Sequence, residues 1–354
     1  MWKNRIILDC DLMKFPNTGL FHYCLNLGNY VNELFDEAGE ERMRFYVPPA
    51  QAHWFKDQQL VIKESRHHKF FSPFLWGCKL WHAPFQSGRV FPMNNPSIKV
   101  LLTIHDLNAL HEDLPSDVQE RSVAHTQKLI NRSNAIVCIS EFCKSDVLKF
   151  CEVGNKPVYV IHNGTHAVGD PSLNKMSYKP SRPFLFGMGD VNRKKNFHTL
   201  IPMMAANQFD LIIAGRLAEG DYIEQIQNEA EALGIRERVH ILGPVTEGEK
   251  AWYLQHCLGY VHPSLAEGFG APVVEAMSFG KPLFLSHLTS LPEIGGDVAF
   301  YFKSFDSDHM SEVLYDGLQY FQKNGLSQKI KERSTHFNWK EKAKQYRDVY
   351  HSLL

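Results

Sequence analysis

The chain has 354 residues, of which 44% are hydrophobic and 22% are charged, and its formal net charge is −1. This length predicts about two domains, because a typical domain has ~150 residues. A net charge near zero argues against a nucleic-acid-binding protein, which needs a dense positive surface to displace counterions. The N-terminus lacks the apolar core of a signal peptide, and no apolar run approaches the ~20 residues of a membrane span. We therefore expect a soluble, cytoplasmic protein.

The seven cysteines form neither CxxC pairs nor the spacing of zinc ligands. Their number is odd, so they cannot all pair within one chain. Buried, reduced thiols in a cytosolic protein are the simplest interpretation.

Short apolar runs alternate with longer amphipathic stretches along the first half of the chain. This alternation is typical of βαβ units and of a mostly parallel sheet. Helical stretches separate several of the runs, for example residues 118–132, where apolar residues recur every three or four positions. We predict strands in residues 5–10, 44–49, 80–84, 99–106, 135–140 and 158–164.

Residues 165–183 are rich in Pro, Ser and Gly and lack periodicity, which predicts a linker. The alternation then restarts, so the second half is expected to form another doubly wound α/β domain. Ligands of such sheets lie off the carboxyl ends of the strands, and we expect the site in a cleft between the two domains. The predicted strands of the second half are residues 184–190, 211–215, 239–245, 259–264 and 282–287.

The stretch EGFGAPVVE sets two carboxylates, Glu267 and Glu275, around two glycines and a proline. It follows the predicted strand 259–264, and its glycines disfavour regular structure. Pro272 suits the first turn of a helix, and Gly280 suits the end of that helix. Glu267 is therefore expected in a loop at the carboxyl end of a strand, and Glu275 in the first turn of the next helix.

This arrangement has a chemical use. The N-terminus of a helix offers N–H groups and a partial positive charge, which suit a phosphate or a diphosphate. A carboxylate on each side of such an anion site can accept hydrogen bonds from hydroxyl groups. A nucleotide-sugar has this layout, with ribose hydroxyls, a diphosphate and sugar hydroxyls in order.

The stretch HPSLAEGFGAPVVEAMSFGKPL resembles the E-x7-E signature of the retaining glycosyltransferases of family 4, which have the GT-B fold. The closing FNWKEKAKQYRDVY is similar to the C-terminal helix that crosses back onto the first domain in that family. Other stretches occur in the family's usual order and spacing, namely TIHDLNALH, NAIVCISEFCKSDV, VIHNG, GMGDVNRKKNFHTLI, RVHILGPV and TSLPEIGGDVAFYF.

The resemblance covers nearly the whole chain. It implies an α/β protein of GT-B architecture, with two Rossmann-like, doubly wound domains that face each other across a cleft. The expected parts are an N-terminal acceptor-side domain in residues 1–168, a linker in 169–183, a donor domain in 184–336 and the returning helix in 337–354.

The resemblance also implies roles for the residues around EGFG. Glu267 would contact the transferred sugar, and Glu275 would hold the ribose of the nucleotide. The backbone of Phe269, Gly270 and Ala271 would meet the sugar and the diphosphate. The alternative is that both glutamates are ordinary solvated carboxylates, since Glu near a helix N-terminus is favourable in any case.

Lys195 in NRKKN matches the family's diphosphate lysine, which neutralises charge as the leaving group departs. An exposed basic turn is the alternative interpretation. Many relatives carry Arg soon after the glycine matching Gly189, whereas this chain has Asp190. Arg193 is a candidate for the second cation, as is Lys194.

Four further matches complete the expected donor site. Gly19 matches the family's glycine loop facing the donor diphosphate, and His105 matches a histidine that contacts the donor sugar. Gly243 and Val245 match the segment whose backbone meets the nucleobase. A structural histidine is the alternative for His105, and the neighbouring Asp106 would suit a helix cap.

Three features are set aside. The DCD of residues 9–11 mimics a metal-binding motif of another transferase fold, but it ends a strand here, and the resemblance implies no obligatory metal. Asn192 stands where the third glycine of a dinucleotide fingerprint would be. The basic and aromatic residues 66–81 would suit a membrane surface or a lipid-linked acceptor, but we favour a packed helix that leads into a strand.

The implied reaction moves a hexose, with mannose as the first choice, from a nucleotide-sugar to a glycan or a lipid-linked saccharide with retention of configuration. Bacterial surface polysaccharide synthesis, at the inner face of the membrane, is the expected setting. GDP-mannose is the first donor candidate and UDP-hexoses are the alternative. A non-catalytic partner subunit and a GT-B epimerase are rival interpretations. A glycoside hydrolase would need its two carboxylates roughly 5–9.5 Å apart across one bond. Glu267 and Glu275, on either side of an anion-binding helix end, suit a nucleotide-sugar better.

Overall fold

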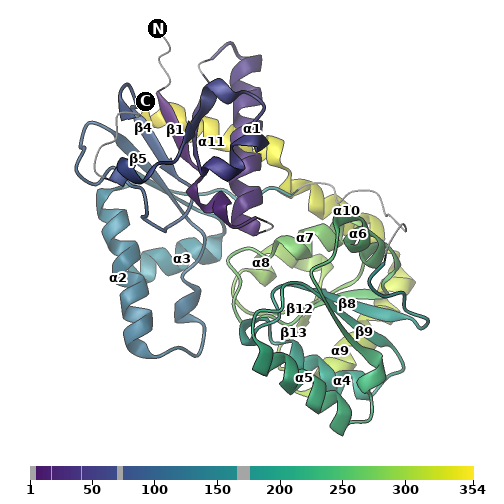
Figure 1. The fold of residues 1–354 in the computed structure, drawn as a ribbon. Coiled ribbons are helices and arrows are strands. Elements are labelled where there is room, and N and C mark those ends of the chain that lie inside the picture. Colours follow the sequence, from purple (N-terminus) through teal and green to yellow (C-terminus); the bar gives the residue numbers. More distant parts are fainter. Residues whose placement is uncertain (1–4, 17, 41, 70–74, 166–175) are drawn as a thin grey trace. The chain divides into compact units, whose positions relative to one another are not determined.

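The computed structural model describes residues 5–16, 18–40, 42–69, 75–165 and 176–354. The chain divides into two compact units, which are described separately (Figure 1). Unit 1 comprises Met1–Gly164 and Phe337–Leu354, and unit 2 comprises Thr165–His336. Residues 169–175 of the predicted linker lie outside the described residues. Within the part of the chain that is described, no helix is long and apolar enough to cross a membrane.

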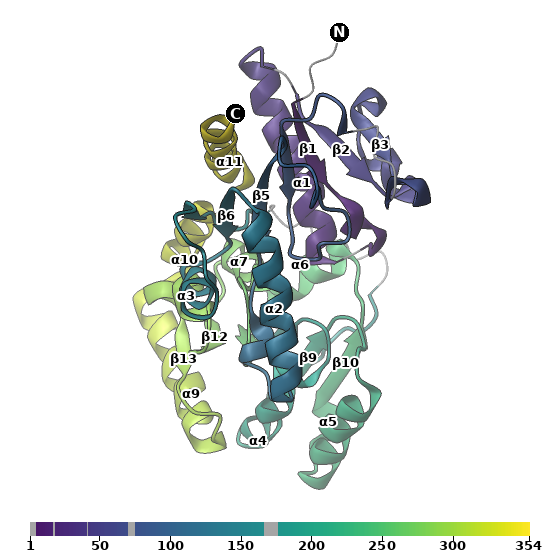
Figure 2. The same cartoon turned by 90° about the vertical axis from the view of Figure 1, so that its left-hand side faces the viewer.

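Unit 1 is built on a seven-stranded sheet in the order β3-β2-β1-β4-β5-β6-β7, and its strand pairs are parallel. Figure 2 shows β1, β2 and β3 next to one another in this sheet. The strands are β1 (Ile6–Asp9), β2 (Arg44–Val47), β3 (Val61–Lys63), β4 (Leu80–Ala83), β5 (Lys99–Ile104), β6 (Ala135–Cys138) and β7 (Val158–Val160).

Both faces of this sheet are covered, which explains why its strands are nearly continuous apolar runs. Successive side chains of a strand point to opposite faces. Ile6 and Leu8 pack in one core with helices α1 (Gly19–Glu37) and α11 (Trp339–Leu353), whereas Ile7 packs in the other core. The second core is closed by α2 (Ser116–Arg132) and α3 (Glu141–Phe150).

The C-terminal helix α11 lies against α1 within unit 1 (Figure 1). Two tyrosines of α11 make buried hydrogen bonds there. The hydroxyl of Tyr346 lies 2.5 Å from that of Tyr23, and the hydroxyl of Tyr350 lies 2.7 Å from Nδ1 of His82. The other ring nitrogen of His82 lies 2.8 Å from Oγ1 of Thr103. Burial lowers the pKa of His82 to about 3, so its ring is neutral near neutral pH.

Unit 2 has a six-stranded sheet in the order β10-β9-β8-β11-β12-β13, again with parallel pairs. Its strands are β8 (Phe184–Met188), β9 (Asp210–Ala214), β10 (Val239–Gly243), β11 (Gly259–His262), β12 (Leu283–Ser286) and β13 (Phe300–Phe302). Its helices are α4 (Leu200–Ala205), α5 (Gly220–Ala232), α6 (Glu247–His256), α7 (Ala271–Ser278), α8 (Leu291–Gly295), α9 (Ser307–Asn324) and α10 (Ser327–Ser334).

Helices α4, α5 and α9 pack on one face of this sheet, and α6 and α7 lie on the other (Figure 1). The predicted doubly wound, parallel α/β class is therefore confirmed in each unit. Two short edge strands, β3 and β13, were not predicted, because three-residue strands carry too little pattern to be read.

Two other expectations can be compared with the structure. All seven cysteines are free and buried, as expected. The packed helix expected in residues 66–81 is wrong for the described part, where Arg66–Lys69 forms only a 3₁₀ turn and residues 70–74 lie outside the described residues. Trp76 is 94% exposed, so it does not pack as a helix leading into a strand would require.

Candidate active site

The loop after β11 carries the stretch EGFGAPVVE. Gly270 closes the loop with φ +91°, a conformation that strongly favours glycine, and helix α7 begins at the next residue with Pro272 in its first turn. Glu267 lies in the loop, as predicted. The prediction for Glu275 was wrong in detail, because α7 begins at Ala271 and Glu275 is its fifth residue, in the second turn.

Glu267 is an almost fully buried carboxylate with two partners on one oxygen. Its Oε1 accepts a hydrogen bond from Nε2 of His262 over 2.7 Å and forms an ion pair with the ammonium group of Lys195. Burial alone would raise the pKa of Glu267, but the charge of Lys195 and the hydrogen bond from His262 outweigh it. The pKa of Glu267 therefore lies well below its usual value, and the group is a carboxylate at neutral pH.

Lys195 is held in place by the loop that follows β8. The 3₁₀ turn η7 (Arg193–Lys195) is capped by Asn192, whose side chain accepts from the amide of Lys195 over 3.1 Å. The amide of Leu265 donates to the carbonyl of Lys194 over 2.9 Å, which fastens this turn to the loop of Glu267. A Cβ atom at Gly189 would lie 3.0 Å from Cε of Lys195, so the glycine leaves room for the lysine side chain.

The backbone of Glu267 is fixed from a third segment, the turn between β12 and α8. The amide of Glu267 donates to Oγ1 of Thr289 over 3.0 Å, and Oγ of Ser290 donates to the carbonyl of Glu267 over 2.9 Å. Thr289 has φ +53°, which is unusual for a β-branched residue and costs of order 1–3 kcal/mol. Strain of this kind persists where neighbouring structure enforces it, and it gathers at functional sites.

Glu275 forms an ion pair with a lysine other than Lys195. Its Oε2 lies 3.1 Å from Nζ of Lys250 on α6, and the same ammonium lies 2.8 Å from a carboxylate oxygen of Glu247. Lys250 is only 7% exposed, whereas the Glu275 side chain is 22% exposed. Burial raises the pKa of Glu275, and Lys250 opposes this rise. One oxygen of Glu275 is thus engaged by Lys250, while the partly exposed carboxylate keeps capacity to accept further hydrogen bonds.

The predicted nucleobase segment lies directly before α6, the helix that carries Lys250. Gly243 ends β10 at an irregularity in the ladder, with φ +75°, and its carbonyl accepts from the amide of Gly215 over 2.9 Å. Val245 is partly buried and lies two residues before Glu247. Because Glu247 is the first residue of α6 and shares Lys250 with Glu275, the N-terminal half of α6, which follows this segment, is tied to helix α7.

Arg193 does not point toward Glu267. Its guanidinium lies 2.6 Å from a carboxylate oxygen of Asp221 and 2.8 Å from Oε1 of Gln225, both on α5. Asp190 is paired as well, with Arg216 at 2.5 Å. Arg216, in the loop after β9, therefore places an exposed cation beside Asp190, which stands where many relatives carry Arg.

The two predicted residues of unit 1 lie at the start of α1 and after β5. Gly19 is the first residue of α1, and a Cβ atom there would meet nothing within 4 Å, so packing does not demand a glycine. His105 is buried, and its Nε2 donates to the carbonyl of Pro84 over 2.8 Å, which leaves Nδ1 as the acceptor nitrogen. Burial lowers the pKa of His105 to about 4, so the ring is neutral at neutral pH. The side chain of Asp106 accepts from the amide of Asn108 and so caps the turn that follows.

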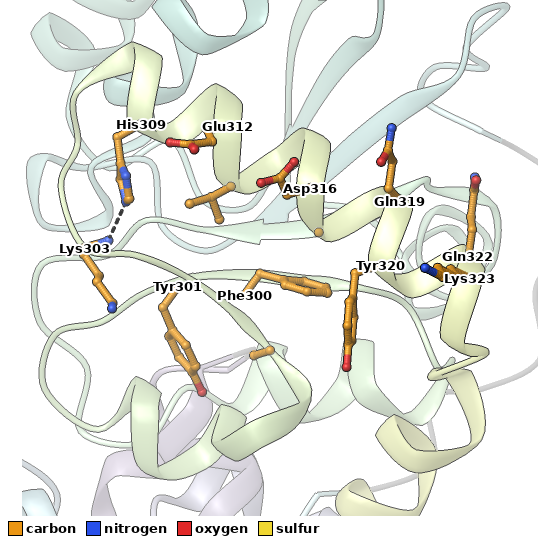
Figure 3. A pocket seen from close by; sticks show the side chains of 13 residues that line it. Phe300, Tyr301, Lys303, His309, Glu312, Asp316, Gln319, Tyr320, Gln322 and Lys323 are labelled. Atoms are coloured by element: carbon orange, nitrogen blue, oxygen red, sulfur yellow. Dashed lines mark hydrogen bonds between the residues drawn. The ribbon is translucent and has the colours of Figure 1, made fainter.

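A large groove in unit 2 lies apart from these residues. It has a volume of about 1270 Å³ and runs between β13 and α9 (Figure 3). Phe300 and Tyr320 line it, together with side chains of both charge signs such as Lys303 and Glu312. None of the predicted site residues lines this groove.

Unit 2 thus brings Lys195 and Glu267 into contact and holds Glu275 on the helix that begins at the end of the same loop. Sequence reasoning missed His262, Thr289 and Lys250, which act on the predicted carboxylates. One signal was available, because His262 lies near the end of the predicted strand 259–264 and is the last residue of β11, where side chains reach the carboxyl edge of a sheet. The positions of Thr289 and Lys250 depend on tertiary contacts alone.

Comparison with known proteins bears on the family and the fold of the chain. The family model described as Glycosyltransferase Family 4 matches residues 53–167, and the model described as Glycosyl transferases group 1 matches residues 173–334. A solved structure of HepE from Anabaena in complex with UDP and glucose has a TM-score of 0.77 at 18% identity and covers 98% of this chain and 100% of that one. This likeness confirms the predicted GT-B fold.

Two relatives from Escherichia coli match in sequence. The O-antigen chain mannosyltransferase B is 25% identical over 359 residues, which cover 89% of this chain and 91% of that protein. The serotype-specific mannosyltransferase WbdA is 26% identical over 246 residues. That match covers 64% of this chain but 30% of WbdA, so the chain spans about a third of that longer protein.

Proposed function

The chain belongs to the family 4 glycosyltransferases with the GT-B fold, and from this membership we propose that it transfers a hexose from a nucleotide-sugar to a saccharide with retention of configuration. Mannose from GDP-mannose is the first choice, because the similar O-antigen chain protein is named a mannosyltransferase. A UDP-hexose is the alternative, since HepE binds UDP and glucose. The proposed acceptor is a growing glycan or a lipid-linked saccharide of a bacterial surface polysaccharide, at the cytoplasmic face of the membrane.

One observation carries this proposal, namely the contact between Lys195 and Glu267. Glu267 lies in the loop that leads directly into α7, so this contact is near the start of the helix. The first amides of a helix have no partner inside it and favour anions. An ammonium group beside them suits a diphosphate, and a carboxylate that is ionised at neutral pH suits the hydroxyls of the attached sugar. Cation, helix end and carboxylate therefore match the order of groups in a nucleotide-sugar.

In the proposed reaction, the bond between the anomeric carbon and the phosphate oxygen breaks, and its electron pair goes to the diphosphate. Lys195 and the amides of Gly270 and Ala271 stabilise this negative charge as it develops. The acceptor hydroxyl forms the new bond on the same face of the sugar, and its proton goes to the departing diphosphate. Glu267 holds the sugar hydroxyls, so that the positions of the reacting atoms are fixed before the bond breaks.

Glu275 supplies the other anchor of the proposed donor site. Its carboxylate accepts hydrogen bonds from the ribose hydroxyls, while the ion pair with Lys250 keeps the carboxylate oriented. The backbone from Gly243 to Val245 then meets the nucleobase. For unit 1 we propose donor contacts by His105, which offers Nδ1 as an acceptor to a sugar hydroxyl, and by Gly19, whose missing side chain leaves space for a phosphate group.

Thermal-shift screening with GDP, UDP, ADP and their sugars tests the donor, because a ligand that binds the folded state raises the melting temperature. We expect a GDP species to give the largest shift and the protein to release nucleoside diphosphate slowly from that donor even without an acceptor. The anomeric configuration of the product, read by NMR, tests retention. The proposal is wrong if no nucleotide shifts the melting temperature.

A further inference from the structure

Glu267 is the end of a buried hydrogen-bonded series that begins inside the sheet of unit 2. Tyr260 and His262 are alternate residues of β11, and both are at most 1% exposed. The hydroxyl of Tyr260 lies 3.1 Å from Nδ1 of His262, and Nε2 of His262 lies 2.7 Å from Oε1 of Glu267.

The chemistry of the three groups fixes the direction of each hydrogen bond. The carboxylate of Glu267 can only accept, so Nε2 of His262 carries the proton and donates. A neutral imidazole then has a lone pair on Nδ1, which accepts from the hydroxyl of Tyr260. Burial lowers the pKa of His262 although Glu267 opposes this, which is consistent with the neutral ring. The carboxylate of Glu267 thus selects the tautomer, and the hydroxyl of Tyr260, which also lies 3.4 Å from the carbonyl of Met188, supports it by donating to Nδ1.

The same oxygen of Glu267 is shared by His262 and Lys195, and these two partners differ in freedom. Lys195 carries its ammonium group at the end of a long side chain with several rotatable bonds, on the turn η7. A bound diphosphate would compete with Glu267 for this ammonium group. His262 is locked in a strand. When Lys195 turns toward the diphosphate, the hydrogen bond from His262 therefore remains.

From this geometry we propose that His262, which donates from Nε2 to Glu267 and is supported at Nδ1 by Tyr260, is the positioning residue that holds Glu267 in place while Lys195 binds the diphosphate. The inference rests on the proposed function for its catalytic consequence. The titratable and charged groups that face His262 are Tyr260 on its own strand, Glu267 on the following loop and Lys195 on the turn η7.

The tautomer is tested without any sugar transfer. Protein labelled with ¹⁵N-histidine gives ring-nitrogen signals, and the signal lost in His262→Gln identifies His262. The expected signal is a neutral ring with the proton on Nε2 at pH 7.5. In Tyr260→Phe the preference for this tautomer should weaken, whereas in Tyr253→Phe, which removes a hydroxyl bonded to the carbonyl of Tyr178, it should persist. A proton on Nδ1, or a ring protonated on both nitrogens at this pH, would overturn the assignment.

Kinetics test the positioning role. His262→Leu removes the donor, whereas His262→Gln retains an N–H group that can reach Glu267. We expect His262→Leu to lower kcat at least tenfold with the KM for donor within about threefold, and His262→Gln to recover most of kcat. Equal losses in both variants would overturn the proposal. If the wild-type protein transfers no sugar at all, the proposed function fails, and the NMR result still decides the tautomer.

Discussion

Lys195 and Glu267 form an ion pair, and both side chains are nearly buried, with exposed fractions of 13% and 11%. A diphosphate that binds at the start of α7 would bring more negative charge to this pair. It would compete with Glu267 for the ammonium group and would be repelled by the carboxylate. We therefore expect the ion pair to weaken binding of a free nucleoside diphosphate.

Glu267→Gln should separate these two effects. The variant loses the negative charge, so Lys195 is released for the phosphates, and we expect the affinity for nucleoside diphosphate to rise several-fold. Sugar transfer should fall by roughly 10²-fold or more, because the carboxylate that fixes the sugar hydroxyls before the bond breaks is lost. Titration calorimetry and a transfer assay measure the two quantities. Weaker nucleotide binding by the variant would contradict this account of the pair.

The acid stability of the protein should depend on Glu267. Its folded-state pKa lies below the ordinary value of 4.5, so the ionised group stabilises the fold above about pH 4.5, and this contribution is lost as the pH falls through the folded-state pKa. Urea unfolding between pH 3 and 7 measures the loss. Glu267→Gln should lose less stability toward acid than the wild type, whereas the exposed Glu224→Gln on α5 should behave like the wild type.

Glu275→Gln should affect binding more than chemistry. A hydrogen bond to a charged group contributes ~1.5–3 kcal/mol, so loss of the ribose contact should raise the KM for donor about tenfold or more with kcat changed less than threefold. Glu247→Gln is the matched control, because Glu247 is the exposed partner of the same Lys250. Equal KM values in the two variants would rule out the ribose role.

Tyr350→Phe should destabilise unit 1. It removes the hydroxyl that bonds Nδ1 of His82 and leaves a buried ring nitrogen without a partner, which costs roughly 1–3 kcal/mol. Chemical denaturation followed by tryptophan fluorescence reads the loss. Tyr320→Phe removes a hydroxyl from a tyrosine that is 55% exposed on α9 and should change the stability by less than 0.5 kcal/mol, about the limit for surface substitutions. Similar stabilities of the two variants would show that α11 is not held by this hydrogen bond.

Much of the fold could be predicted because parallel strands buried on both faces are continuous apolar runs, as in β8 and β9. The edge strand β13 was missed because it has only three residues. In the candidate site, Lys195 and Glu267 could be found from a motif, and the structure places them in contact.

The remaining site residues could not be read from the sequence, for reasons that differ between them. His262 and Thr289 act on Glu267 through hydrogen bonds between segments that meet only in the folded protein, and the positive φ of Thr289 is indicated by no local pattern. The guanidinium of Arg193 pairs with Asp221 on α5, and its contact with the diphosphate stays a prediction. Spacing along a chain cannot indicate which of two neighbours a long side chain will choose.

The most direct test of the central claim is the affinity of nucleoside diphosphates for the wild-type protein and for Lys195→Met, measured by titration calorimetry. Lys329→Met is the control, because it removes an exposed charge on α10 that pairs with Asp297 and has no proposed role in the donor site. We predict that GDP or UDP binds the wild type, that Lys195→Met weakens this binding at least tenfold, and that Lys329→Met changes it less than threefold. Equal affinities of the wild type and Lys195→Met would contradict the claim that this lysine holds the diphosphate.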